Sequence, residues 1–167
     1  AGTVGLVQLA LTHSNSAACT NPTNTFLFQK LATGSLGKCA ASETISYNSW
    51  KHIVATWDGS VNASGVRIFK NGVEVTYAGT SSNATGLSSD SALNLHIGNR
   101  GDAARTFDGF IDEVRISNVV RSAGWITTEY NNQSSPATFY SVGGEQQTTG
   151  TTGARQTVIG GDQSGRV

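Results

Sequence analysis

Residues 50–77 constrain the fold more than any other part of the sequence. Residues 50–57 are mostly β-branched or aromatic, which predicts a strand that is buried on both faces. Residues 66–77 alternate between apolar and polar positions on each side of Asn71 and Gly72, two residues that accept the positive φ angles of a type I′ hairpin. We therefore expect three consecutive antiparallel strands joined by tight turns.

Strand-like patterns continue on both sides of this stretch. They are found at residues 4–11, 26–31, 38–42, 93–97, 110–116 and 138–142. Ser122 is suited to cap one short helix near residues 122–131, in which Trp125, Ile126 and Tyr130 have the spacing that faces a core. We also expect Trp50 to be buried. The chain is thus predicted to be all-β and antiparallel, with a single helix.

Four motifs follow one another along the chain. They are Trp-Lys-His-Ile-Val-Ala-Thr-Trp-Asp-Gly at 50–59, Val-Arg-Ile-Phe-Lys-Asn-Gly-Val-Glu-Val at 66–75, Leu-His-Ile-Gly-Asn at 95–99 and Phe-Asp-Gly-Phe-Ile-Asp-Glu-Val-Arg-Ile at 107–116. This series resembles the laminin-G-like jelly-roll domains of the concanavalin A-like lectin/glucanase superfamily, above all the bacterial and viral members. The resemblance implies an antiparallel jelly-roll β-sandwich over residues 1–143 that lacks the family's first strands. Residues 144–167 form a low-complexity C-terminal tail.

Composition restricts the classes of partner. Only 13% of the residues are charged, and 11 Lys and Arg balance 11 Asp and Glu, which argues against a nucleic-acid-binding surface. No apolar run is long enough to span a bilayer. Abundant Ser, Thr, Asn and Gly are typical of exported β proteins, so we expect an extracellular, cell-surface or virion-surface location.

The two cysteines, Cys19 and Cys39, are too few for a zinc site without other ligands. We interpret them as a disulfide between neighbouring strands in an oxidising compartment. Two buried thiols are the alternative.

The superfamily includes glycosidases, whose two catalytic carboxylates lie about 5–5.5 Å or about 6.5–9.5 Å apart. Asp112 and Glu113 are adjacent and would point to opposite faces of a strand, whereas Asp108 and Asp112 would be separated by about 13 Å in an extended chain. Unless carboxylates from different loops converge, the chain is not an enzyme.

The resemblance also implies that calcium could bind at a rim of the sandwich through Asp side chains and loop carbonyls. The candidate ligands are Asp58, Asp102 and Asp108, which lie in or beside expected loops. The alternative is that Asp58 and Asp108 only start the turns at the glycines that follow them.

A mixture of amide, charged and aromatic residues in the expected loop after residue 97 suits glycan binding. The candidate ligand-binding residues are Asn99, Arg100, Asp102, Arg105 and Phe107. The long loop at residues 78–92 would lie nearby. A solvated loop without a ligand is the alternative. Asn62, Asn83 and Asn132 begin Asn-x-Ser/Thr sequons.

Two functions are compatible with these features. The first is a non-catalytic extracellular recognition or adhesion domain that binds glycans or cell-surface and matrix partners through its loops. The second is a structural subunit of an extracellular filament, surface layer or virion that assembles by strand or tail exchange. The low-complexity tail and the neutral composition favour the second hypothesis.

Overall fold

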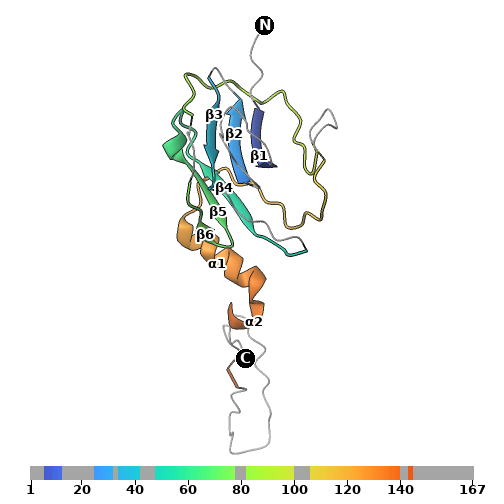
Figure 1. Cartoon of the computed structure of the whole chain (residues 1–167). Helices are drawn as coiled ribbons and strands as arrows, with labels where there is room; N and C mark the ends of the chain where they lie inside the picture. Colours follow the sequence, from blue (N-terminus) through green and yellow to red (C-terminus); the bar gives the residue numbers. More distant parts are fainter. Residues whose placement is uncertain are drawn as a thin grey trace, which may run out of the picture.

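The computed structural model describes residues 6–12, 25–31, 34–41, 48–77, 82–99, 106–139 and 143–144. Its elements are β1 (Leu6–Thr12), β2 (Thr25–Leu31), β3 (Leu36–Cys39), β4 (Ile53–Trp57), the 3₁₀ helix η1 (Ala63–Gly65), β5 (Val66–Lys70), β6 (Val73–Glu74), α1 (Ala123–Ser134) and α2 (Pro136–Phe139). Figure 1 shows the strands gathered in one body, with α1 and α2 at one end of it.

The first sheet has the order β1-β2-β3, and both pairings are antiparallel. The three strands confirm the predictions at residues 4–11, 26–31 and 38–42 within a few residues. Phe28 of β2 pairs with Leu9 on one side and with Lys38 on the other. Phe28 is buried, so the middle strand contributes an aromatic ring to the core.

The second sheet has the order β4-β5-β6 and is also antiparallel. The predicted hairpin is confirmed, because Asn71 and Gly72 have φ angles of 52° and 77°. The expected burial of both faces of β4 is wrong, since Thr56 is buried but the other four residues of β4 are only half-buried. In β5, by contrast, both Ile68 and Phe69 are buried on their opposite faces.

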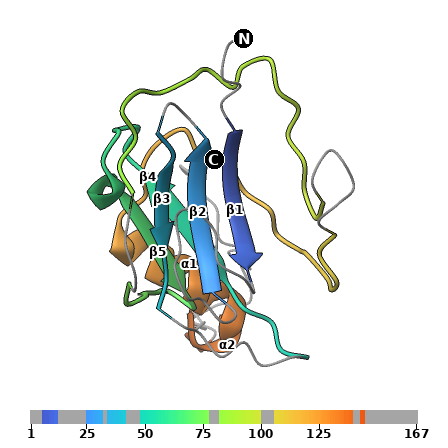
Figure 2. The ribbon, with the colours of Figure 1, turned by 45° about the horizontal axis from the view of Figure 1, so that its top comes forward.

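One buried cluster joins the two sheets. Its members are Phe28, Leu36, Ala40, Ala63, Val66, Ile68, Val75 and Ala84. Two antiparallel bridges, Gly37 to Ser82 and Ala40 to Tyr77, connect β3 to the chain that leaves the second sheet. Figure 2 shows the first sheet as a layer over β4 and β5. The antiparallel sheets and their shared core therefore agree with part of the predicted sandwich.

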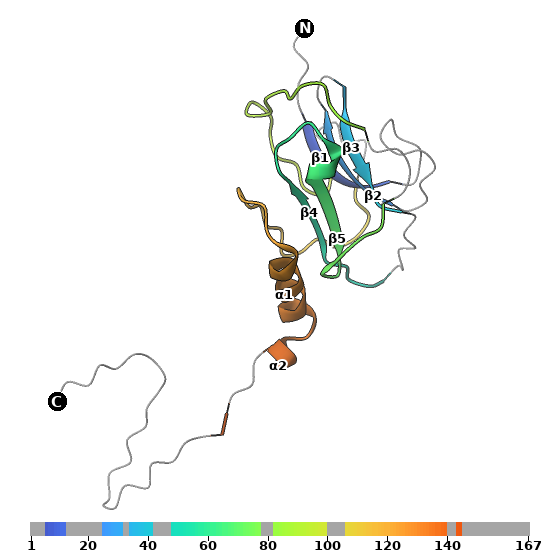
Figure 3. The same ribbon diagram turned by 90° about the vertical axis from the view of Figure 1, so that its left-hand side faces the viewer.

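Helix α1 confirms the predicted helix and its cap. The Ser122 hydroxyl accepts a hydrogen bond from the main-chain nitrogen of Trp125 at 3.2 Å, and the helix continues to Ser134, beyond the predicted end. Ile126 is completely buried. The Thr127 hydroxyl donates a 2.7 Å hydrogen bond to the oxygen of Gly72, so the helix lies on the β5–β6 turn, at the end of the second sheet (Figure 3).

Two predicted strands, at residues 93–97 and 110–116, are wrong. Both segments lack strand structure, and their apolar side chains are exposed, for example Leu95 at 68% and Phe110 at 88%. Alternation of apolar and polar residues marks a strand only where another backbone completes its hydrogen bonds. Neither segment has such a partner among the described residues.

The predicted closing strand at residues 138–142 is wrong at its start, because Thr138 lies in α2 and residues 140–142 are outside the described part. Proline is well suited to the first position of a helix, and Pro136 occupies that position in α2.

Burial of two tryptophans was also predicted wrongly, since Trp50 and Trp125 are 68% and 42% exposed. Apart from residues 143 and 144, the tail is outside the described part.

Candidate functional site: a polar hollow beside Lys38

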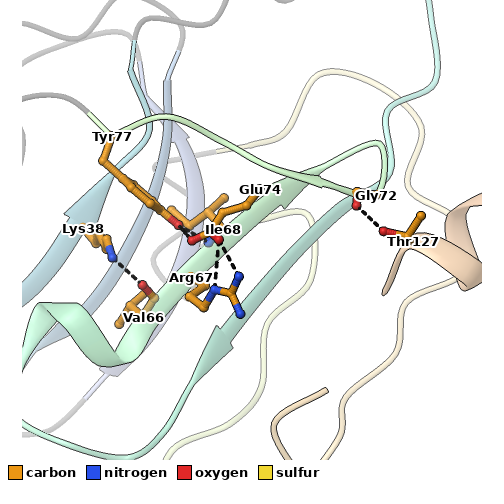
Figure 4. Close-up of polar contacts among 8 residues, drawn as sticks. All are labelled: Lys38, Val66, Arg67, Ile68, Gly72, Glu74, Tyr77 and Thr127. Atoms are coloured by element: carbon orange, nitrogen blue, oxygen red, sulfur yellow. Dashed lines mark hydrogen bonds and ion pairs between the residues drawn. The ribbon is translucent and has the colours of Figure 1, made fainter. Parts of the chain in front are cut away.

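The side chain of Lys38, in the first sheet, contacts the second sheet. Its Nζ donates a 2.7 Å hydrogen bond to the main-chain oxygen of Val66 and lies 4.0 Å from the centre of the Tyr77 ring. Figure 4 shows Lys38 reaching from β3 to the start of β5, with Tyr77 beside it. A hydrogen bond and a cation–π contact thus hold the ammonium group in one position.

The Tyr77 hydroxyl links the ring that contacts Lys38 to the ion pair between Glu74 and Arg67. It accepts a 2.9 Å hydrogen bond from the main-chain nitrogen of Ile68 and donates one of 2.7 Å to Oε1 of Glu74. The other carboxylate oxygen of Glu74 lies 2.5 Å from a guanidinium nitrogen of Arg67 (Figure 4). The Glu74 carboxylate is therefore shared between Arg67 and Tyr77.

Burial and these contacts shift the proton affinities of the network. Burial raises the pKa of Tyr77 to about 12, and the hydrogen bond to Glu74 adds to this effect. The hydrogen bond from Arg67 lowers the pKa of Glu74. Burial lowers the pKa of Lys38, against the opposing effect of the Glu74 charge. At neutral pH the network therefore holds two cations, one carboxylate and a neutral phenol.

An open hollow of about 400 Å³ lies beside Lys38. It is lined by Lys38, Asn62, Ala63, Ser64 and Asn83. Oδ1 of Asn83 accepts a 2.8 Å hydrogen bond from the main-chain nitrogen of Ala63, which attaches the segment after residue 82 to η1. The hollow is thus built from β3, from η1 and from a loop that is distant in sequence.

The side chains around the hollow have hydrogen-bonding groups to spare. Asn62 precedes η1 but its side chain does not cap the helix, and Asn62, Ser64 and Asn83 are exposed. Asn83 uses its oxygen for Ala63, which leaves its amide nitrogen as a donor for a ligand. Amides, a hydroxyl and an ammonium group in one concave site are suited to binding a small polar ligand.

The residues that were predicted to bind a ligand lie elsewhere. The main-chain nitrogen of Phe107 donates a 2.7 Å hydrogen bond to the oxygen of Gly98, so Asn99 and Phe107 lie at the ends of one closed loop. Phe107 is 44% exposed, as a stacking residue requires, but neither residue lines the hollow. The other three predicted residues, Arg100, Asp102 and Arg105, lie outside the described residues.

The predicted calcium ligands are not brought together in the part that the structure describes. Oδ1 of Asp58 accepts a 2.9 Å hydrogen bond from the main-chain nitrogen of Ser60, which lowers the pKa of Asp58 and fits the alternative role as a turn residue. Asp108 is exposed, and Asp102 is outside the described residues. No group of three metal-binding side chains occurs among the residues described. Calcium binding stays a prediction.

Cys39 lies in β3, is only 3% exposed and is not a free thiol, which favours the disulfide over two buried thiols. Its predicted partner, Cys19, is outside the described residues, so the disulfide stays a prediction.

One pair of carboxylates does converge, although sequence spacing did not suggest it. Glu113 and Glu129 both bind the guanidinium group of Arg115, through different nitrogens. A glycosidase needs one carboxyl group to protonate the leaving oxygen and another to face the sugar. Glu113 and Glu129 are instead partners of the same cation, and the contact between Arg115 and Glu129 attaches the segment before α1 to that helix.

Sequence reasoning missed the hollow, although it noted two of its residues. Asn62 and Asn83 were recognised only as the first residues of sequons, and the loop at 78–92 was expected only to lie near the predicted ligand-binding loop. Lys38 gave no signal, because a lysine in a strand is ordinarily a solvated surface residue. Its role depends on Val66 and Tyr77, which lie 28 and 39 positions further along the chain.

Comparisons with known proteins identify the family. Searches of curated proteins and of solved structures gave no significant match. Within the described residues, no helix has the length and apolar character required to cross a membrane. A family model described as the concanavalin A-like lectin/glucanases superfamily matches residues 11–127, more than half of the sequence and all four of the recognised motifs. The chain belongs to the laminin-G-like family of the concanavalin A-like lectin/glucanase superfamily.

Proposed function

We propose that the chain is a non-catalytic extracellular recognition domain that binds a glycan in the hollow beside Lys38. Laminin-G-like domains are typically binding domains, often for carbohydrates or protein partners, and they are commonly extracellular. The observation that supports this proposal most directly is the convergence of three uncharged polar side chains and one ammonium group around a hollow. Sugar hydroxyls both donate and accept hydrogen bonds, and Asn and Ser side chains match both needs.

A glycan array probed with the whole chain tests this proposal. Asn62→Ala and Ser64→Ala should each remove binding of the sugars that the wild-type chain retains, because both side chains line the hollow. Asn99→Ala and Phe107→Ala are the matched controls from the site predicted by sequence. If the controls abolish binding while the hollow variants keep it, the ligand lies at the loop after residue 97. Absence of binding to any sugar would contradict the glycan function.

The same array with and without calcium tests the cofactor. Calcium ligated by Asp58, Asp102 and Asp108 would make binding sensitive to chelator. No carboxylate belongs to the described residues that line the proposed hollow, so binding there should be unchanged by a chelator. Loss of binding on chelation would instead favour the rim site and its Asp ligands.

One exposed apolar surface favours a second function, in which the chain is a structural subunit that assembles with other copies of itself. Large apolar side chains are exposed along residues 93–120: Leu93, Leu95, Ile97, Phe107, Phe110, Ile111, Val114, Ile116, Val119 and Val120. Segments 93–97 and 110–116 also keep strand-like patterns without a ladder partner in the described part. Another copy could complete these strands by main-chain pairing.

Sedimentation velocity over a range of concentrations tests this second function. Assembly that persists in the wild-type chain and disappears on deletion of residues 144–167 supports exchange of the tail. Assembly that survives the deletion but is lost in Phe110→Ser with Ile116→Ser assigns it to the apolar segment. A chain that stays monomeric at all concentrations contradicts the assembly function.

A further inference from the structure

Among the described residues that line the hollow, Lys38 supplies the one charged side chain. An ammonium group has three N–H donors, and the bond to Val66 uses one of them. The Tyr77 ring lies against the ammonium group but has no lone pair there to accept a hydrogen bond. Lys38 can therefore offer a charged donor to a ligand without leaving its position.

Within the described residues, the network formed by Lys38, Tyr77, Glu74 and Arg67 is net positive. Glu74 and Arg67 are the charged groups that affect Lys38. Glu74 is already bound by Arg67 and by the Tyr77 hydroxyl, so its charge is mostly balanced within that group. Asp58, in the neighbouring turn, keeps its negative charge when it binds Ser60, but it is not among the described residues that line the hollow. Two cations and one carboxylate in the network give a net charge of about +1.

Resting on the proposed glycan function, we propose that the hollow selects a saccharide unit that carries a carboxylate, such as a uronic acid. The Lys38 ammonium binds the carboxylate, while Asn62, Ser64 and Asn83 bind the ring hydroxyls. A charge-assisted hydrogen bond is shorter and about twice as strong as a neutral one. A neutral sugar of the same shape offers no charged acceptor, so the remaining N–H groups of Lys38 would stay hydrogen-bonded to water.

The direct test compares two probes that share their ring hydroxyls, of which only one carries the carboxylate charge. They are an oligomer of galacturonic acid and the same oligomer with its carboxyl groups methyl-esterified, each titrated calorimetrically into the whole chain. The acid should bind at least about tenfold more tightly than the ester, because the ester offers the ammonium group no charged acceptor. The preference should decrease as salt is added.

Two lysine variants separate the hollow from a general surface effect. Lys38→Gln should remove the preference for the acid, whereas Lys51→Gln removes the same charge from outside the hollow and should preserve it. Because Lys38 also binds Val66, thermal unfolding must show that Lys38→Gln is folded. Lys38→Arg keeps the charge and should retain the preference for the acid.

The outcomes distinguish the acidic ligand from the glycan function itself. If the acid and the ester bind equally, and Asn62→Ala weakens both, the hollow binds glycans but the proposal of acid selection is wrong. If Lys51→Gln weakens acid binding as much as Lys38→Gln does, the preference belongs to the overall charge. If no glycan binds in the hollow, the proposed function fails together with this inference.

Discussion

Nζ of Lys38 donates a 2.7 Å hydrogen bond to the main-chain oxygen of Val66, so a side chain of the first sheet binds a strand of the second. The same contact fixes the charged wall of the hollow. Packing of the two sheets and the chemistry of the candidate site therefore depend on one side chain.

Tyr77→Phe should destabilise the fold by about 1–3 kcal/mol, because the buried nitrogen of Ile68 loses the hydroxyl that accepts its hydrogen bond. Tyr130→Phe is the matched control, since no contact of its hydroxyl is recorded in the described residues. Urea unfolding of the two variants measures the difference. Equal stabilities would show that the Tyr77 hydroxyl contributes nothing.

Stability should fall when the pH rises above 10. The pKa of Tyr77 is about 12 in the folded chain, against an ordinary value of 10.0. The unfolded chain therefore loses the phenolic proton first, and the stabilisation that is present below pH 10 disappears as the pH approaches 12. The pH profile of the wild-type unfolding free energy should be steeper in this window than that of Tyr77→Phe. Parallel profiles would contradict the assignment.

Gly72→Ala should destabilise the chain more than Gly59→Ala. Both glycines have positive φ, 77° and 83°, so each alanine introduces backbone strain of about 1–3 kcal/mol. A Cβ on Gly72 would also lie 3.1 Å from Tyr130 and 3.2 Å from Thr127, whereas one on Gly59 meets nothing within 4 Å. The difference between the two variants in urea unfolding isolates the contact with α1. Identical losses would mean that α1 can move away without loss of stability.

The predicted Cys19–Cys39 disulfide should be detectable by mass. The whole chain, purified without reductant, should resist alkylation until it is reduced, and Cys39→Ser should lower stability by about 2–4 kcal/mol. Cys19→Ser should have a similar effect, because either change breaks the same bond. Alkylation of both thiols in the unfolded, unreduced chain would establish the alternative of two thiols.

Local sequence determined several elements of this protein directly. Asn71 and Gly72 form the predicted hairpin because their own backbone preferences favour positive φ. Ser122 caps α1 because its hydroxyl reaches a nitrogen only three residues away. Four motifs in order also identified the laminin-G-like family. The hairpin, the cap and each single motif depend on residues that are close in sequence.

Tertiary structure decided which patterned segments became strands and where the polar residues met. Residues 93–97 and 110–116 alternate as strands do, yet they lack strand structure because a strand requires a second backbone to bond to. The hollow combines Lys38 of β3 with Asn62 before η1 and Asn83 from a distant loop. Periodicity describes the face that a segment offers, but the packing of the sheets selects its partner, and that choice depends on contacts between residues far apart in the chain.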